Sequence, residues 1–516
     1  MENRNTIIAL VLMLIVWSCF SYFFPAKEKD NNKVAEVKQI EKVNNQSFII
    51  EEKDTLISSN ESDFIEFEND NYTLLFDKNG ANIRSVKLNN YKNSNNTKDS
   101  YQFIDYKTGD CLSSFSIENA VANNISYDFE KIDNRIIFKA VFSGLEIVRT
   151  YVFNSGSYLI DCFVTIKNLR TENVDVRFHV DNYNVVPINA ENSRFDYIGA
   201  ISYIDNKLIH NESDDLKEKS ESFRLDNLSW VGYTNKYFIS TLIPVVDNST
   251  PSFDSVAISL SDNVLKFSAL SGSVNLQDGQ SYKASYSMYL GPKDLSFLKS
   301  AGYSLDHVID FGFFSFLAKP LHVCLNFFYG FLGNYGVSII LLTVIIKLLF
   351  WPLTQKSYVS MRAMQTLQPE MKKLREKYRT DREGLNRSMM ELYKEHRVNP
   401  LGGCLPMFVQ IPVFFALYKV LLETIELRHA PFAFWLTDLS VKDPYYITPV
   451  VMGVTMFVQQ KMTPSTMDPM QAKMMLAMPV VFTFLFLNFP SGLVLYWLVN
   501  NLLTIFQQYL IYKKPA

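Results

Sequence analysis

The pattern of hydrophobic and polar positions divides the chain into two parts. Over residues 61–300, apolar and polar side chains alternate in short runs such as FIEFE at 64–68, and Asn79-Gly80 marks a turn between two of these runs. Alternation with a period of two is typical of half-buried antiparallel strands joined by hairpins. We therefore expect residues 61–300 to form a large all-β sandwich.

Over residues 330–512 this alternation gives way to long apolar runs. An apolar stretch of about 17–25 residues is long enough to cross the hydrocarbon core of a bilayer as a helix. The runs predict five transmembrane helices, near 335–353, 404–422, 446–461, 474–489 and 492–511. The third and fourth are short, which favours a locally thin membrane or little tilt.

The segment 354–399, between the first two runs, is basic, with 11 Lys and Arg against 6 Asp and Glu. Short loops of that charge stay on the cytoplasmic side of a membrane. Two helical patterns lie within the segment, separated by a turn near residue 380, and Pro369 is positioned to bend the first. We therefore expect a cytoplasmic helical hairpin at 354–399.

Residues 1–25 contain a further apolar run, which follows a short head that includes Arg4. A cleaved signal peptide and an uncleaved signal anchor both fit such a run. The run continues to Phe24 without a small-residue cleavage site, which favours an anchor helix. Residues 26–60 are polar and predict a flexible periplasmic tether. The expected topology has six spans, both termini cytoplasmic and the large domain outside.

Residues 301–320 carry apolar side chains on one helical face and Asp306 and Asp310 on the other. The segment is too short and too charged to span a membrane. It predicts an interfacial amphipathic helix on the outer surface of the bilayer. A core-packed helix of the soluble domain is the alternative, because amphipathicity does not separate the two.

Lys347 stands inside the first of the five runs, four residues after Thr343 and hence on the same helical face. A lysine at membrane depth costs about 2.5–3.5 kcal/mol on an insertion scale, so it marks a candidate functional site. No acidic residue lies at membrane depth to pair with it, which favours a water-filled groove open to the cytoplasm. Snorkelling towards the basic edge at Leu353, roughly 9 Å away, is the alternative.

The sequence lacks the motifs that are typical of metal sites and of nucleotide hydrolysis. The five cysteines are scattered without a CxxC pair, and no HExxH motif or Cys/His cluster indicates a metal. No GxxxxGK[ST] loop is present, so nucleotide hydrolysis has no visible site. Only Cys111 and Cys162 lie in the sandwich region, and their pairing stays open. We expect no cofactor, no catalytic residues and no enzymatic activity.

Methionines gather on the two elements predicted to face the cytoplasm, and flexible thioethers suit a surface that accepts many apolar shapes. Ordinary helix packing is the alternative for any one of them. With the basic residues of the hairpin, whose charge also suits a ribosome, they form the predicted cytoplasmic contact set: Met361, Met364, Met371, Met389, Met390, Lys372, Lys373, Arg375, Met467 and Met470.

A cationic groove beside an adaptable apolar surface suits a client that is an apolar segment with acidic flanks. The groove would draw the hydrophilic flank partway into the membrane, and hydrophobic partitioning of the client would supply the driving force. A secondary transporter or channel is the main alternative, although it predicts inverted repeats and paired intramembrane charges. A membrane-tethered glycan-active enzyme is a third possibility.

Three segments resemble the YidC membrane protein insertase family of Gram-negative bacteria: NPLGGCLPMFVQIPVFFALYKVL at 399–421, DPYYITPVVMGVTMFVQQKM at 443–462 and FPSGLVLYWLVNNL at 489–502. The resemblance covers essentially the whole chain. It implies a periplasmic supersandwich similar to galactose-mutarotase-like folds but without catalysis, and a five-helix insertase core. It also implies a bacterial inner-membrane protein that inserts, folds and assembles nascent inner-membrane proteins, alone or with the Sec translocon, and with weak ribosome contact.

The resemblance also implies site residues. The family's groove arginine falls at Lys347, so this chain keeps the charge but lacks the bidentate guanidinium. Thr343 and Gln410 match groove positions. Tyr496 is followed by Trp497 where relatives often have two tyrosines. With the polar position of the last run, the predicted substrate groove comprises Lys347, Thr343, Gln410, Tyr496, Trp497 and Asn500.

Overall fold

The computed structural model describes residues 64–93, 99–103, 112–118, 125–187, 197–218, 220–225, 227–247, 250–378, 381–396, 405–463 and 469–513. The chain divides into two compact units, with the boundary between Ile309 and Asp310. The predicted anchor helix at 1–25 and the tether at 26–60 lie outside the described residues.

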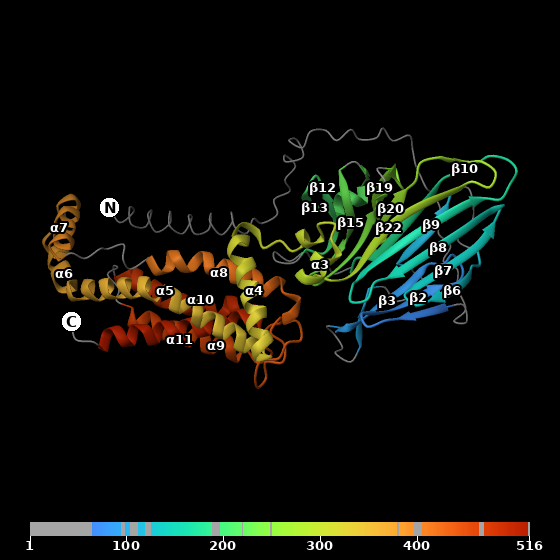
Figure 1. Cartoon of the computed structure of the whole chain (residues 1–516). Coiled ribbons are helices and arrows are strands. Elements are labelled where there is room, and N and C mark those ends of the chain that lie inside the picture. Colours follow the sequence, from blue (N-terminus) through green and yellow to red (C-terminus); the bar gives the residue numbers. More distant parts are fainter. Residues whose placement is uncertain are drawn as a thin grey trace. The chain divides into compact units, whose positions relative to one another are not determined.

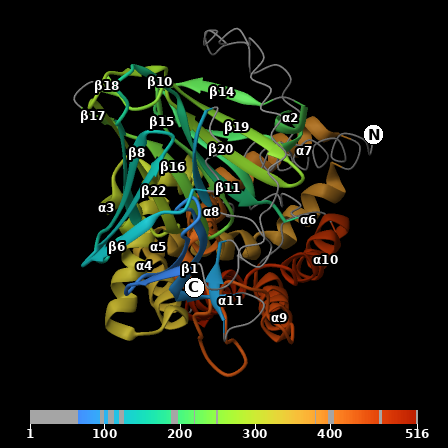
Figure 2. The same cartoon turned by 90° about the vertical axis from the view of Figure 1, so that its right-hand side faces the viewer.

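Two nine-stranded antiparallel sheets form the first unit (Figure 1). One sheet has the order β1–β2–β3–β5–β11–β20–β19–β14, with β4 paired to β3; Figure 2 shows β20, β19 and β14 following one another to its edge. Its strands are β1 Phe64–Glu68, β2 Tyr72–Asp77, β3 Ile83–Lys92, β4 Ser100–Gln102, β5 Ser113–Ile117, β11 Phe178–Val185, β14 Glu221–Arg224, β19 Ser255–Ser261 and β20 Val264–Leu270.

The other sheet has the order β13–β12–β15–β16–β22–β9–β8–β7–β6. Its strands are β6 Asp128–Ile132, β7 Arg135–Phe142, β8 Leu145–Phe153, β9 Leu159–Asn168, β12 Gly199–Ile204, β13 Lys207–Asn211, β15 Leu228–Thr234, β16 Phe238–Pro244 and β22 Ser281–Pro292. The short pairs β10 Val174–Val176 with β21 Val274–Leu276, and β17 Val246–Asp247 with β18 Thr250–Pro251, complete the strands.

The sequence alternation places one face of each strand in the core. Along β8, buried and partly buried residues alternate strictly. Aromatic rings of the two sheets meet between them, with Phe76 on β2 packed 5.0 Å from Tyr151 on β8, centroid to centroid. Cys162, on β9, is a buried free thiol. Cys111 lies outside the described residues. The large β-sandwich predicted from the alternation is confirmed.

Two short helices accompany the strands, α2 Ser213–Glu218 and α3 Leu295–Ala301. The helix expected at 301–320 differs in extent. Two 3-10 turns, η4 Leu305–Val308 and η5 Gly312–Phe314, come first, and the helix α4 runs over Ser315–Leu332. Positive φ at Ser304 (58°) and Gly312 (68°) interrupts any earlier helix.

Helix α4 belongs to the second unit, packs on α5 and α8, and lies at a steep angle to α5 (Figure 1). Ala318, His322 and Leu325 form its buried face. The opposite face exposes large apolar side chains, including Phe327 at 60% and Phe331 at 77%. The interfacial position expected for this part of the chain stays a prediction.

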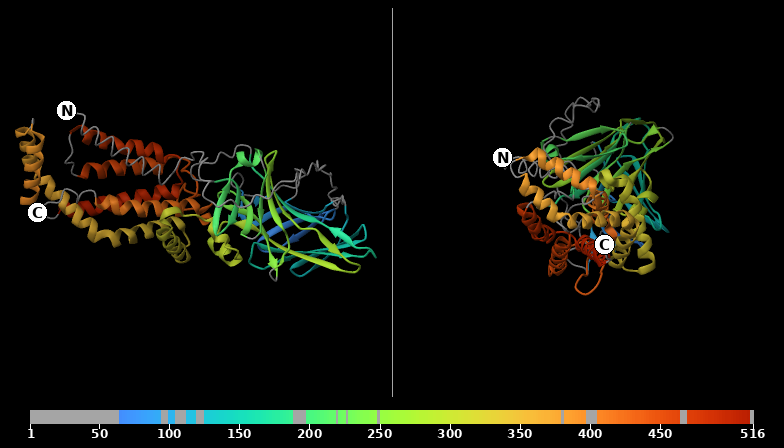
Figure 3. Two further views of the ribbon diagram at one scale, coloured as in Figure 1. Left: turned by 90° about the horizontal axis from the view of Figure 1, so that it is seen from above. Right: turned by 90° about the vertical axis from the view of Figure 1, so that its left-hand side faces the viewer.

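The remaining helices of the second unit are α5 Tyr335–Thr366, α6 Gln368–Lys377, α7 Arg382–Glu395, α8 Leu405–Glu423, α9 Ile447–Met462, α10 Pro469–Phe486 and α11 Ser491–Lys513, with the 3-10 turn η7 Ile425–Leu427 after α8. Of these, α5, α8, α9, α10 and α11 run alongside one another (Figure 3, left), whereas α7 stands at a steep angle to α5 (Figure 1). Helix α11 packs on both α5 and α9, and α10 packs on α9.

Helix α5 is longer than predicted. It does not end near residue 353 but continues to Thr366, so the first half of the expected hairpin helix belongs to α5. The break comes at Leu367, just before Pro369, because proline favours the first turn of a new helix and disfavours a helix interior. Asp381 caps the next helix, α7, through its carboxylate.

By length and apolar composition, α5 is the one helix among the described residues that could cross a membrane; Met474–Phe486 is a shorter apolar helix. Helices α8, α9, α10 and α11 coincide with the other predicted spans to within a few residues. The arrangement of six spans therefore stays a prediction.

Candidate functional site

Lys347 lies in the interior of the helical unit. Asn334 starts α5 by accepting the Val337 backbone N–H at 3.1 Å, and the Ile- and Leu-rich run that follows favours a buried helix. Lys347 is 7% exposed. Its ammonium nitrogen donates to Thr504 Oγ1 at 2.7 Å and to Asn500 Oδ1 at 3.3 Å, both on α11. The lysine is therefore held by a neighbouring helix.

Asn500 and Thr504, one helical turn apart on α11, supply the neutral oxygens that hold the Lys347 ammonium. The water-filled groove and the alternative of snorkelling both stay predictions. The residue Thr504 was missed, although its i+4 spacing from Asn500 could have indicated it.

Within the described residues, no carboxylate lies within 4 Å of the Lys347 ammonium, so its charge is compensated only by dipoles. Burying a charge without an opposite charge is costly, and hydrogen bonds to neutral groups recover only part of the lost hydration. The site therefore has an electrostatic preference for an anionic group.

Further buried polar contacts continue along α11, and we call them the polar seam. Gln507 Nε2 bonds to Thr354 Oγ1 on α5 at 2.8 Å. On the other side, Asn501 Nδ2 donates to Thr455 Oγ1 at 3.4 Å, and Gln508 Nε2 donates to Thr463 Oγ1 at 3.2 Å. The polar seam comprises Lys347, Thr354, Thr455, Thr463, Asn500, Asn501, Thr504, Gln507 and Gln508. It joins α11 to α5 and to α9.

The other predicted groove residues form separate contacts. Thr343 is 2% exposed and donates to the Ile339 carbonyl of its own helix at 2.6 Å. Gln410 on α8 donates to the Tyr496 hydroxyl at 2.7 Å, which gives α8 a polar contact with α11. Trp497 packs edge-on against Phe414, with centroids 4.7 Å apart. The structure thus brings together Lys347 with Asn500, and Gln410 with Tyr496.

Most of the methionines that were predicted to form a contact surface pack against neighbouring helices instead. Met364 and Met371 are buried with Leu367 and Leu392 where α5, α6 and α7 meet, and Met389 packs against that cluster. Met361 is buried with Tyr358 and Ile511. The expectation of an exposed contact surface is wrong for Met361, Met364 and Met371, because a short hairpin has few other large apolar side chains from which to build its core. Met389 is partly buried, and its role in client contact stays a prediction.

Other members of the cytoplasmic contact set remain accessible. Met390 is 55% exposed. Lys372 and Lys373 are exposed on α6, and Arg375 is partly buried. Met467 lies outside the described residues, and the side chain of Met470, in the first turn of α10, is not described.

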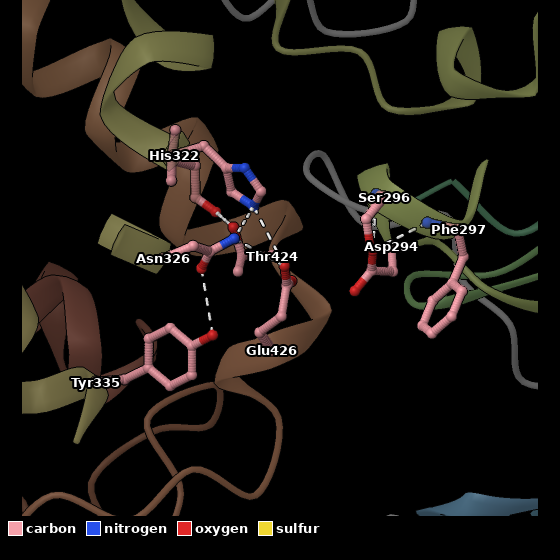
Figure 4. A network of polar contacts seen from close by, with 9 residues as sticks. Asp294, Ser296, Phe297, His322, Asn326, Tyr335, Thr424 and Glu426 are labelled. Carbon is pink, nitrogen blue, oxygen red and sulfur yellow. Dashed lines mark hydrogen bonds and ion pairs between the residues drawn. The ribbon is translucent and has the colours of Figure 1, made fainter. Parts of the chain in front are cut away.

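A second polar network, missed from the sequence, joins α4, α5 and the turn after α8 (Figure 4). His322 Nε2 lies 3.4 Å from Glu426 Oε1, and Asn326 Nδ2 donates to the same oxygen at 3.1 Å. Tyr335 OH donates to Asn326 Oδ1 at 3.2 Å. Burial alone would raise the pKa of Glu426, but the hydrogen bond and charge of His322 lower it overall. The network fastens α4 to the bundle.

The two units correspond to two known family models. Residues 64–324 match the model described as "YidC periplasmic domain", and residues 327–516 match "60Kd inner membrane protein". A protein of Geotalea daltonii named "Membrane protein insertase YidC" is 42% identical over 539 residues, covering 100% of both chains. The chain belongs to the YidC family.

A second YidC protein, from Geobacter metallireducens, is 49% identical over 376 residues, which cover 72% of this chain and 69% of the relative. A solved YidC structure, described as an active insertase with its first transmembrane domain resolved, covers 89% of this chain at 18% identity with a TM-score of 0.39. Membership of the YidC family makes the chain an inner-membrane protein whose β-sandwich is the periplasmic domain.

Proposed function

We propose that this protein inserts and folds nascent membrane proteins in the bacterial inner membrane, and that Lys347 receives the acidic flank of a client segment. The observation that carries the proposal is the buried Lys347 ammonium, which has only neutral oxygens around it in the described residues. Similarity to proteins named membrane protein insertase over the full length of the chain supports the general activity.

Two free-energy changes favour insertion in this proposal, one electrostatic and one hydrophobic. A client carboxylate that approaches Lys347 supplies the opposite charge that the site lacks, which lowers the cost of bringing that flank into the membrane. The apolar segment of the client then partitions into lipid, at about 0.8 kcal/mol for each buried CH₂ group. No nucleotide is required for either step.

The proposed groove, membrane topology and partners follow from the positions of the charged residues and of the helices. A groove open to the cytoplasm would lead to Lys347, bordered by α5, α8 and α11. Six spans with both termini cytoplasmic would place α6 and α7 at the inner surface, where Lys372, Lys373 and Arg375 offer positive charge to a ribosome. Cooperation with the Sec translocon and lipid contact at α4 belong to the same proposal.

Complementation of an insertase-depleted strain tests the proposal. We compare the wild type with Lys347→Arg, Lys347→Ala and Lys347→Glu. Arg is expected to support growth, Ala to impair clients with acidic translocated flanks, and Glu to be worst because it repels them. Equal rescue by all four would contradict an electrostatic role for Lys347.

Photocrosslinking probes at positions 343, 347 and 410 supply an independent test. A nascent inner-membrane client is expected to crosslink at 347 and 410, which line the proposed path. The absence of any client crosslink in a protein that supports growth would exclude the proposed path.

A further inference from the structure

Two of the hydrogen bonds of Thr504 have opposite roles. Its hydroxyl donates to the Asn500 carbonyl, one turn earlier on α11, at 2.7 Å. The same oxygen accepts from the Lys347 ammonium, also at 2.7 Å. A hydroxyl has one hydrogen, and the backbone carbonyl takes it. The lone pairs of Thr504 are therefore left to face the ammonium, so this side chain is oriented as an acceptor.

The donors of Lys347 are only partly used. An ammonium group has three N–H donors. Thr504 accepts one at 2.7 Å, and the Asn500 side-chain oxygen accepts a second at 3.3 Å. No third acceptor for Lys347 is found in the described parts of the chain, so one donor remains for an incoming group. A compact ammonium with one remaining donor suits a single carboxylate oxygen.

We infer that Thr504, assisted by Asn500, is a positioning residue, which fixes the Lys347 ammonium so that its remaining donor meets one carboxylate of the client. The inference rests on the proposed function. Thr504 acts through Lys347 and has no need to touch the client. It is distinct from the groove positions, because its role is to hold the lysine and not to line the path.

Thr455 provides a matched control within the same unit. Its hydroxyl also donates to a backbone carbonyl of its own helix, Met452 O, at 2.7 Å, and accepts from a side chain of α11, Asn501, at 3.4 Å. The two threonines thus share residue type, back-bonding and a place in the polar seam. Only Thr504 accepts from a charged donor.

The experiment uses the full-length protein in proteoliposomes with two single-span clients, one with Asp and Glu in its translocated flank and one with Asn and Gln there. Thr504→Val is expected to lower insertion of the acidic client about ten- to a hundredfold, the scale of one lost hydrogen bond to a charged group, and to spare the neutral client. Thr504→Ser is expected to restore the rate, because serine keeps the hydroxyl. Thr455→Val is expected to insert both clients at the wild-type rate.

Three results would overturn the inference. The first is wild-type insertion of the acidic client by Thr504→Val. The second is an equal loss for both clients, which would indicate a purely structural role. The double variant Lys347→Met with Thr504→Val is expected to insert no more slowly than Lys347→Met alone, and an additive loss would also contradict it. If Lys347→Ala inserts both clients normally, the proposed role of Lys347 fails. A defect in Lys347→Ala with normal Thr504→Val overturns only the positioning role.

Discussion

Gln507 on α11 and Thr354 on α5 hydrogen-bond side chain to side chain at 2.8 Å, and both residues are buried. This contact is the last one of the polar seam between α11 and α5, about one helical turn after Thr504 along α11. Each side chain also has a backbone partner, because Thr354 Oγ1 lies 3.0 Å from the Phe350 carbonyl and Gln507 Nε2 lies 3.4 Å from the Trp351 carbonyl. Loss of one side chain therefore removes one hydrogen bond and leaves the other side chain partly satisfied.

A double-mutant cycle on this pair checks that argument. Thr354→Val and Gln507→Leu are each expected to lower the free energy of unfolding by about 0.5–1.5 kcal/mol, the net contribution of one hydrogen bond, whereas the double variant should lose less than the sum. Thermal unfolding of the purified protein in detergent measures all four forms. Strict additivity would show that the two side chains do not stabilise each other.

The network around Glu426 predicts a pH dependence. Since the pKa of Glu426 in the folded protein lies below its ordinary value of 4.5, ionised Glu426 stabilises the fold at higher pH. That contribution is present above pH 4.5 and is lost as the pH falls through the lower folded-state value. The variant Glu426→Gln should therefore be less stable than wild type near neutral pH, with a gap that narrows below pH 4.5.

Unfolding midpoints of the wild type and Glu426→Gln, measured across that pH range, give the comparison. Glu395→Gln, at an exposed position of α7, serves as the control and should follow the wild type throughout. A constant gap between Glu426→Gln and the wild type at every pH would rule out the ionised carboxylate as the stabilising form.

Two helical glycines predict opposite responses to alanine. A Cβ atom at Gly453 on α9 would lie 2.0 Å from Thr483 Oγ1 on α10, whereas a Cβ at Gly330 on α4 meets nothing within 4 Å. Gly453→Ala should destabilise the protein by about 1–3 kcal/mol through overpacking. Gly330→Ala should stabilise it by about 0.5–1 kcal/mol, since alanine favours the helix. The same unfolding assay measures both, and a stable Gly453→Ala would contradict the close α9–α10 packing.

The contact between Gln410 and Tyr496 predicts a change in client access. Tyr496→Phe removes the hydroxyl that accepts from Gln410 and keeps the ring. The freed amide of Gln410 should then reach the client more often, so a photoreactive probe carried by the client should crosslink to α8 more often while its crosslinking to α5 stays constant. Tyr509→Phe, which alters an exposed tyrosine of the same helix, is the control. Identical crosslinking of the client to α8 in both variants would argue against coupling between this pair and the client.

The sequence predicted local features well, because they depend on local pattern. Strict alternation predicted the strands of the sandwich, such as β8. Pro369 was expected to bend a helix from inside, and it lies instead in the first turn of α6, directly after the break at Leu367. Contacts between distant segments were not accessible in the same way. The partner of Lys347 at Thr504 lies 157 residues away, and no periodicity indicates which face of α11 meets α5.

The methionines show a different limit. Met364 and Met371 are spaced seven residues apart, which would place them on one face of a continuous helix. An exposed binding surface and the buried core of a hairpin both have that spacing, so the sequence pattern could not distinguish between them. Likewise, the apolar residues before Ser315 have helical spacing, yet the positive φ values at Ser304 and Gly312 interrupt the helix there. Backbone conformation of that kind is set by the surrounding chain.

The unbroken course of α5 has a mechanical consequence. From Lys347 to the end of the helix at Thr366 the chain rises about 28 Å at 1.5 Å per residue, as one continuous helix that holds Pro352 in its interior and reaches α6. The buried cluster of Met364, Met371 and Leu392 packs α6 and α7 against the far end of that helix. A partner that docked on α6 and α7 would therefore act on the same helix that carries Lys347, and Pro352, which lacks a backbone N–H, is the point at which that helix bends most easily.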